Sequence, residues 1–187
     1  MPVIRKILPT ELPLYRAHLL RLDRADRYAR FTGTVSDESL ARHCAGIDWS
    51  RTILIGAFLN GELRAAIELC SDRILWPNEA EFGVSVEKEL QGRGVGSTLI
   101  RRALTVARNR SVGRVHIQCL AENVRMRALA RRFGGRSSIE CGEIAASFEL
   151  PPPNQFSFAL EALEDGAGAF NSMLASFASG PQQRAAA

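Results

Sequence analysis

Residues 79–109, which read EAEFGVSVEKELQGRGVGSTLIRRALTVARN, decide the fold of this chain. The apolar and small residues from Ala80 to Val86 make a run of strand length. From Gly94 onward, apolar residues recur at the spacing of one helix face, at Val95, Leu99, Ile100, Ala103, Val106 and Ala107. The stretch therefore predicts a strand and a helix, joined by a turn that contains Gly92, Gly94 and Gly96.

The glycine-rich turn predicts a binding site for a phosphate group. Glycine has no Cβ, so the backbone N–H groups of such a turn can approach a ligand closely. The turn also opens a helix, whose N-terminal end attracts anions. Two common nucleotide motifs are excluded, because a P-loop needs a lysine before Ser97 and a GxGxxG fingerprint needs glycine at Ser97 or Leu99.

The turn resembles the Q/R-x-x-G-x-G/A signature of the GNAT acyltransferase superfamily, which Gln91–Gly96 matches as QGRGVG. The flanking segments are similar to the same family. Ala80–Gly83 resembles the end of the family's fourth strand, Arg114–Leu120 its fifth strand, and Asn123 the residue that opens the next helix. The resemblance covers roughly residues 3–150, and its specific part lies within residues 79–135.

This resemblance implies an α/β GNAT fold, with a mixed central sheet of six or seven strands flanked by about four helices. The GNAT domain would span residues 1–150, and residues 151–187 would form a partly helical C-terminal tail. Acetyl-CoA would be bound as the acyl donor, with its pantetheine in a V-shaped gap between strands four and five. The residues implied to bind it are Val84, Val86, Gln91, Gly92, Arg93, Gly94, Val95, Gly96, Ser97 and Asn123.

Acylation of an amine requires a base, because an amine with an ordinary pKa of about 10.4 is protonated near neutral pH. Glu81 is the first candidate, since it matches the family's acidic position on the fourth strand, and Glu79 is the second. A β-bulge, which the family often has here, would change which carboxylate faces the cleft. Both could instead be surface charges at a strand edge. A backbone N–H near Val84 or Val86 would stabilise the negative charge on the thioester oxygen.

The chain departs from the family at one catalytic position. Many members carry a tyrosine seven residues after the helix-opening asparagine, where it protonates the departing CoA thiolate, but this chain has Ala130 there. The thiolate could leave unassisted, since thiols have pKa values near 8.5. Tyr28 is the strongest substitute acid, and Cys119 and Ser97 are weaker ones.

Tyr28 belongs to a segment, Asp23–Phe31, that resembles the region over the acceptor site in bacterial protein lysine acetyltransferases. This likeness implies that Tyr28 and Asp26 contact the acceptor. The alternative is a surface ion-pair network in which Tyr28 and Phe31 act as amphipathic anchors.

Composition narrows the class of protein. The net charge of +4 comes almost wholly from arginine, and the arginines between Arg93 and Arg136 predict a solvated helix face or contacts to the phosphates of CoA. No aromatic interleaving accompanies them, so we expect no nucleic-acid partner. The sequence contains no run of about eighteen apolar residues, so we predict no membrane-spanning helix. The four cysteines form no CxxC pair, which indicates free thiols in a reducing cytoplasm and no metal site.

The other predicted elements follow from local signals. Thr10 is expected to cap a helix to Arg21, and Ser36 to cap another that ends near Ile47. Asn60-Gly61 predicts a hairpin. The remaining predicted strands cover residues 3–8, 52–59, 62–73 and one or two segments of 137–150, with Gly142 at a turn.

The apolar tail predicts a helix that is interrupted at Gly166 and Gly168 and ends before disordered residues 180–187. Its many apolar residues need cover, so it either packs on the domain or joins two subunits as a homodimer.

Taken together, the sequence predicts an acetyl-CoA-dependent N-acetyltransferase that acts by direct transfer in a ternary complex. The alternative is an acyl-CoA sensor or interaction module with little catalysis. The acceptor is open between protein lysine and small amines, and the Asp23–Phe31 segment favours protein lysine slightly.

Overall fold

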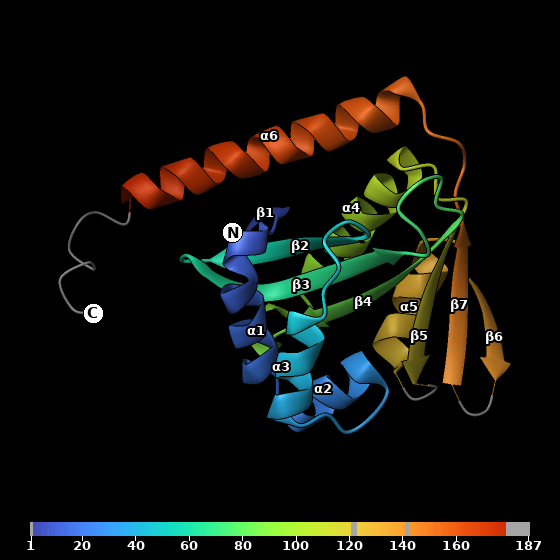
Figure 1. Ribbon diagram of the computed structural model, residues 1–187, viewed down its shortest axis with the longest axis horizontal. Coiled ribbons are helices and arrows are strands. Elements are labelled where there is room, and N and C mark those ends of the chain that lie inside the picture. Colours follow the sequence, from blue (N-terminus) through green and yellow to red (C-terminus); the bar gives the residue numbers. More distant parts are fainter. Residues whose placement is uncertain (1, 121–122, 141–142, 179–187) are drawn as a thin grey trace.

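The computed structural model describes residues 2–120, 123–140 and 143–178 (Figure 1). Within these residues the strands are β1 (Val3–Lys6), β2 (Thr52–Leu59), β3 (Glu62–Ser71), β4 (Glu79–Val86), β5 (Arg114–Leu120), β6 (Arg136–Glu140) and β7 (Glu143–Glu149). The α-helices are α1 (Leu12–Arg21), α2 (Arg24–Phe31), α3 (Asp37–Ala45), α4 (Val95–Asn109), α5 (Val124–Arg132) and α6 (Gln155–Ala178).

The strands form one mixed sheet in the order β1-β2-β3-β4-β5-β7-β6. β4 and β5 run parallel, and every other neighbouring pair runs antiparallel. Helices α1, α2 and α3 lie on one face of the sheet, and α4 and α5 lie on the other (Figure 1). The predicted α/β fold with a mixed sheet of six or seven strands is confirmed, and the tail forms the helix α6.

The helix that follows the glycine turn packs as its spacing predicts. In α4 the six apolar positions of the predicted face are all buried against the sheet: Val95, Leu99, Ile100, Ala103, Val106 and Ala107. This packing fixes the direction in which the N-terminus of α4 points, and so it fixes the position of the turn.

Two predictions from short sequence motifs are confirmed, a helix cap and a hairpin turn. Ser36 caps α3 by accepting a hydrogen bond from the N–H of Ser39 at 3.2 Å. Asn60 and Gly61 have φ of 53° and 82°, the left-handed conformation that a tight β2–β3 hairpin requires.

Two local predictions near the N-terminus differ from the structure. Residues 24–31, for which no helix is predicted above, form the helix α2, and Asp23 caps it by accepting from the N–H of Asp26 at 2.8 Å. Thr10 caps no helix: Pro9–Glu11 form a 3-10 turn, and the Glu11 carboxylate binds the N–H of Leu8 at 2.9 Å.

The tail helix α6 packs back on the domain, across β1 and α4 (Figure 1). It is continuous from Gln155 to Ala178, so the predicted interruption at Gly166 and Gly168 is wrong. Gly168 lies so close to β1 that a Cβ there would come within 2.7 Å of the Ile4 carbonyl oxygen. Tertiary packing therefore accounts for this glycine, and the helix continues despite its low helix propensity.

Ion pairs hold α6 in place. Lys6 of β1 contacts Glu161 and Asp165, each at 2.6 Å. Arg102 of α4, whose side chain is buried, contacts Asp165 at 3.0 Å and Glu164 at 3.2 Å. Because Arg102 also donates to the Ile4 carbonyl at 2.6 Å, it joins α4, α6 and β1 at one point.

Some predictions fall outside the described residues, namely the turn at Gly142 and the disorder of residues 180–187. Within the part of the chain that is described, no helix is both long and apolar enough to cross a bilayer. The same part holds no group of three or more His, Cys, Asp or Glu side chains placed to bind a metal ion.

The two glycines of α6 provide a matched test of its packing. We expect Gly168→Ala to lower the free energy of unfolding by about 1 kcal/mol or more, because the new methyl group overlaps β1. Gly166→Ala should instead raise it by about 0.5–1 kcal/mol, since a Cβ there meets no atom within 4 Å and alanine favours helix. Denaturant unfolding of both variants at low protein concentration measures the difference. Equal effects of the two changes would contradict the close packing of Gly168.

Candidate functional site

The central feature of the site is a gap where two neighbouring strands part. β4 and β5 are paired only at Glu79–Arg114, Ala80–Val115 and Glu81–His116. Beyond these pairs β4 continues to Val86 and β5 to Leu120 without a shared ladder, so the strands diverge. The V-shaped gap that the resemblance implied is therefore present.

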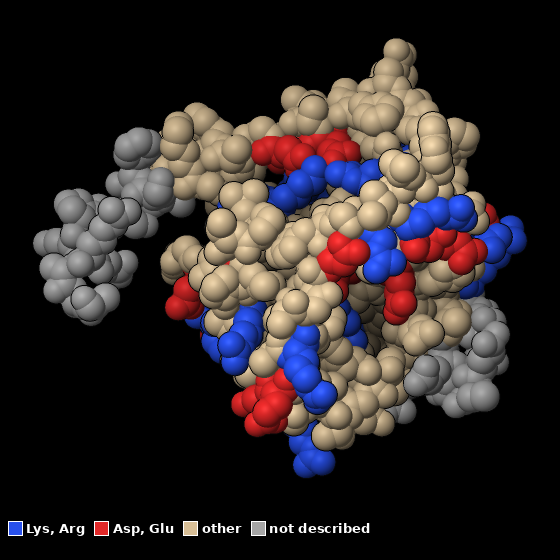
Figure 2. All heavy atoms as spheres, viewed as in Figure 1, with Lys and Arg blue, Asp and Glu red and all other residues tan. Residues whose placement is uncertain are grey.

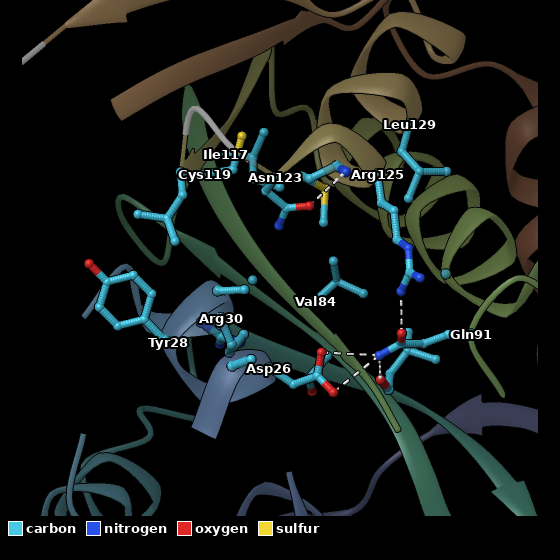
Figure 3. A pocket seen from close by; sticks show the side chains of 18 of the residues that line it. Asp26, Tyr28, Arg30, Val84, Gln91, Ile117, Cys119, Asn123, Arg125 and Leu129 are labelled. Carbon is cyan, nitrogen blue, oxygen red and sulfur yellow. Dashed lines mark hydrogen bonds between the residues drawn. The ribbon is translucent and has the colours of Figure 1, made fainter. Parts of the chain in front are cut away.

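A cavity of about 1660 Å³ occupies this gap. Its walls come from α2, the second half of β4, the glycine turn, the end of β5 and the first turns of α5 (Figure 3). Ile117 and Leu129 make part of an apolar side, and Arg125 and Arg132 place two cations at the side of α5. Such a cavity can take a long ligand that is apolar along its length and anionic at one end.

The glycine turn lies at one end of the cavity and has the backbone that an anion site requires. Gly92 and Gly94 have φ of 73° and 80°, a backbone conformation that residues other than glycine adopt only with strain. A Cβ at either position would meet no atom within 4 Å, so the space beside the backbone is open. Gly94 is also the N-cap of α4, whose first N–H groups have no partner within the helix.

Most of the turn residues that sequence reasoning assigned to the ligand do line the cavity: Gln91, Gly92, Gly94, Val95, Gly96 and Ser97. Arg93 does not, since its side chain is exposed and lies outside the lining. The cations that do lie beside the turn belong to α5, where Arg132 donates to the Ser97 hydroxyl at 3.4 Å.

Gln91 has a second role that the motif did not reveal. Its side-chain NH₂ group donates to the Asp26 carboxylate at 3.1 and 3.2 Å and to the Val86 carbonyl at 2.8 Å. Its side-chain oxygen accepts from Arg125. One amide therefore joins α2, β4 and α5 across the cavity wall (Figure 3).

The backbone of β4 offers donors to the gap. Glu87, which follows β4, donates its N–H to the carbonyl oxygen of Arg64 in β3, and successive residues of a strand point their N–H groups to opposite sides. The N–H groups of Val84 and Val86 therefore point away from β3, toward the side that β5 has left. Both residues line the cavity, as predicted.

The two candidate bases are separated by their surroundings. The register between β3 and β4 is unbroken from Ala80 to Val86, so no bulge redirects a side chain there. Glu81 is exposed and lines the cavity. Glu79 does not line it, and instead its carboxylate faces Arg114 at 3.5 Å and His116 at 3.6 Å.

A buried polar cluster lies under this part of β4. Oε2 of Glu68 accepts hydrogen bonds from Tyr15 at 2.9 Å and from Arg30 and His43 at 2.8 Å each. Burial raises the pKa of the Glu68 carboxyl, but these donors outweigh it and hold the pKa below its usual value. Burial is also the main reason that the pKa of the Tyr15 phenol is raised. We infer that Glu68 is ionised and the Tyr15 phenol is protonated.

Arg30 connects this cluster to the cavity. Its guanidinium lies directly over Gly83, where a Cβ would come within 2.1 Å of the Arg30 Cζ. It also lies near enough to Glu81 to interact with that carboxylate electrostatically. Sequence reasoning missed this residue. The available signal was Gly83 itself, because glycine inside a strand often marks the close approach of another group.

Most of the remaining predicted residues line the cavity, from α2, β5 and the start of α5. Tyr28 projects from α2 and is 41% exposed on the cavity wall. Asp26 is bound to Gln91. Asn123 lines the cavity while its side-chain oxygen caps α5 by accepting from the N–H of Met126 at 3.0 Å.

Ala130 is buried in the core. Cys119 lines the cavity from β5, and burial raises the pKa of its thiol.

Comparison with known proteins agrees with this geometry. The model of the Acetyltransferase (GNAT) family matches residues 17–135. The GNAT domain of S. lividans PAT superposes with a TM-score of 0.68 at 23% identity, over 79% of this chain and 89% of that one. A GNAT-family acetyltransferase from Streptococcus pneumoniae gives 0.62 at 18% identity, over 80% and 100% of the two chains.

The yncA protein of Salmonella typhimurium, solved with its cofactor acetyl-CoA, gives a TM-score of 0.60 at 15% identity, over 82% of this chain and 96% of that one. At these identities the structures establish a shared fold. The family model covers more than half of the residues, including the glycine turn and β5. The chain therefore belongs to the GNAT acetyltransferase family.

Proposed function

We propose that this protein is an acetyl-CoA-dependent N-acetyltransferase that transfers the acetyl group directly to a primary amine within a ternary complex. The observation that carries the proposal is the convergence of three features on one cavity. These are the glycine turn at the N-terminus of α4, the outward N–H groups of Val84 and Val86, and the Glu81 carboxylate.

The donor half of the cavity fits acetyl-CoA. The N–H groups from Gly92 to Ser97 would bind the pyrophosphate, because they are concentrated at a helix N-terminus and no Cβ blocks Gly92 or Gly94. The pantetheine arm would lie in the gap between β4 and β5, beside Val84 and Val86. Asn123, which lines the same cavity, would contact the arm from the start of α5. No metal is required for any of these contacts.

Attack of the acceptor on the thioester requires that one proton is removed from the ammonium group and that the negative charge on the thioester oxygen is stabilised. Glu81 would take a proton from the acceptor ammonium, directly or through one water molecule, and the free amine would attack the thioester carbonyl carbon. The N–H of Val84 or Val86 would stabilise the oxyanion that forms. The carbon–sulfur bond then breaks and CoA leaves as the thiolate. The nitrogen gives up its second proton to form the amide, and this proton reaches the sulfur through water or replaces the one that Tyr28 donates.

Tyr28 is the acid that we assign to the departing thiolate. Ala130 provides no hydroxyl and is buried, so the family's usual tyrosine has no counterpart there. Tyr28 stands on the cavity wall and would donate its phenolic proton to the sulfur. This step is of modest importance, because a thiolate with a pKa near 8.5 is a good leaving group.

The acceptor would enter on the α2 side of the cavity, beside Tyr28 and Glu81. Both residues line the cavity there. Protein lysine is the acceptor class that we favour, on the likeness of Asp23–Phe31 to protein lysine acetyltransferases. We accordingly propose a bacterial, cytoplasmic enzyme that acetylates lysine side chains of other proteins.

Ala130 supports a second candidate function, a sensor that binds acyl-CoA with little turnover. The two candidates differ in one observable. Calorimetric titration with acetyl-CoA followed by a free-thiol assay over amines and lysine peptides separates them. Acceptor-dependent thiol release identifies the transferase, and binding without release identifies the sensor.

The glycine turn can be tested by substitution at Gly94. Gly94→Asp should raise the Kd for acetyl-CoA at least about 100-fold, because it places a negative charge beside the pyrophosphate. Gly94→Asn imposes similar strain without charge and should cost less than about tenfold, since Asn tolerates a positive φ. Gly61→Asp, at a hairpin φ of 82°, controls for strain alone. Unchanged affinity in Gly94→Asp would refute the assignment of the turn.

The base can be tested by a matched pair of changes on β4. Glu81→Gln should lower kcat about 100-fold or more and leave the Kd for acetyl-CoA unchanged, because the amide cannot accept the proton. Glu79→Gln should retain nearly all activity, since this carboxylate lies outside the cavity lining. Steady-state kinetics and calorimetry measure both. The opposite ranking of the two variants would transfer the role to Glu79.

Tyr28→Phe removes only the phenolic hydroxyl. We expect kcat to fall by about tenfold, a small loss because the thiolate is a good leaving group. The Kd for acetyl-CoA should stay constant. The loss should disappear with a thioester donor of lower thiol pKa, and a loss that is independent of the donor would show that Tyr28 binds the acceptor instead.

A further inference from the structure

The outer face of α6 carries an apolar seam with the spacing of a coiled coil. Phe156, Ala159, Leu163, Gly166 and Phe170 alternate in steps of three and four residues, and the same spacing continues in the sequence to Met173 and Phe177. The large members are exposed, with Phe156 at 75%, Leu163 at 71% and Phe170 at 57%. We call residues 156, 159, 163, 166 and 170 the outer seam.

The charges of α6 all lie on its other side. Between Gln155 and Ala178 the only charged residues are Glu161, Glu164 and Asp165, and each is paired with a basic residue of the domain. Figure 2 shows these acidic side chains between the helix and a row of basic side chains beneath it. The polar side of this amphipathic helix is therefore occupied by its own domain, and its apolar side faces solvent, the reverse of the usual arrangement.

We propose that the outer seam is the interface with a second copy of this chain, whose α6 packs on it in antiparallel orientation about a two-fold axis near Gly166. An interface of this symmetry must be self-complementary. The outer seam meets that requirement at its centre, because an axis between 166 and 167 places Leu163 of one copy opposite Phe170 of the other. At the crossing point both copies present Gly166. A Cβ at this position would meet no atom within 4 Å, so the two helices can approach closely there.

The exposed area is sufficient for a dimer. The large apolar side chains exposed on α6 are Phe156, Phe158, Leu160, Leu163, Phe170, Met173 and Leu174. By helical spacing Phe158 and Leu160 lie away from the outer seam. With full areas on the order of 200 Å² each, the other five expose roughly 600 Å² per copy, the lower end of the ~600–1,000 Å² per partner of a stable interface.

A membrane surface is the competing occupant, and the charges oppose it. Helices that lie on membranes have a polar face rich in Lys and Arg, which binds anionic lipids. The polar face of α6 is acidic and is already paired with Lys6 and Arg102. A second copy needs no such cation, because the outer seam carries no charge.

The first test is the mass of the full-length protein in solution, measured by analytical ultracentrifugation over a range of concentrations. The wild type should be a dimer. Leu163→Glu should raise the dimer dissociation constant at least about 100-fold, since the dimer would bury two unpaired carboxylates. Asn171→Glu adds the same charge beside the outer seam and should leave the dimer intact. Circular dichroism confirms that each variant is folded.

The second test addresses the orientation of the helices. In the double variant Leu163→Glu with Phe170→Lys, an antiparallel pair brings each new carboxylate opposite a new ammonium, and the dimer should be restored. A parallel pair brings like charges together. Continued dissociation of the double variant would overturn the antiparallel arrangement.

Three results would overturn the proposal as a whole. They are a wild type that stays monomeric at every concentration, a dimer that survives Leu163→Glu, and a monomer that sediments with vesicles of phosphatidylglycerol through α6. None of these results depends on acetyl-CoA or on activity, so the test is independent of the proposed function.

Discussion

The structure depends on the point at which β4 and β5 stop pairing. Only three residue pairs join these parallel strands, and the last is Glu81–His116. If pairing continued, the N–H groups of Val84 and Val86 would be used within the sheet and no cavity would exist. Because it stops, the interior of the sheet is opened to a ligand. The antiparallel register with β3 remains complete, so the strand stays rigid while one of its sides becomes a binding surface.

Features that depend on a few adjacent residues were predictable from the sequence. The Asn60-Gly61 pair favours one backbone conformation, that of a tight β-hairpin. Ser36 and Asn123 cap helices because their side chains are the right length to bind a nearby N–H. The glycine turn was predictable together with the strand and helix around it, since apolar periodicity located both elements and their order placed the turn between them.

Features that depend on distant contacts were not predictable. Nothing near Arg30 indicates that its guanidinium lies over Gly83, some fifty residues later, or that Glu68 collects three donors beneath it. The continuity of α6 through Gly166 and Gly168 has the same origin, because the helix is held by ion pairs to Lys6 and Arg102 rather than by its own propensity. Local preference is weak compared with such packing, so sequence reasoning favoured the break.

Gln91 has a consequence for how the binding of one ligand changes the affinity for another. Its single amide contacts α2 on one side of the cavity and α5 on the other, so the two sides share one set of hydrogen bonds. Ligands that both stabilise this set are thermodynamically linked, and linkage is reciprocal. Whatever factor the donor adds to the affinity for the acceptor, the acceptor must add to the affinity for the donor. Under the proposed function, acetyl-CoA and the acceptor amine would therefore bind with positive cooperativity within one subunit, without any large movement of the fold.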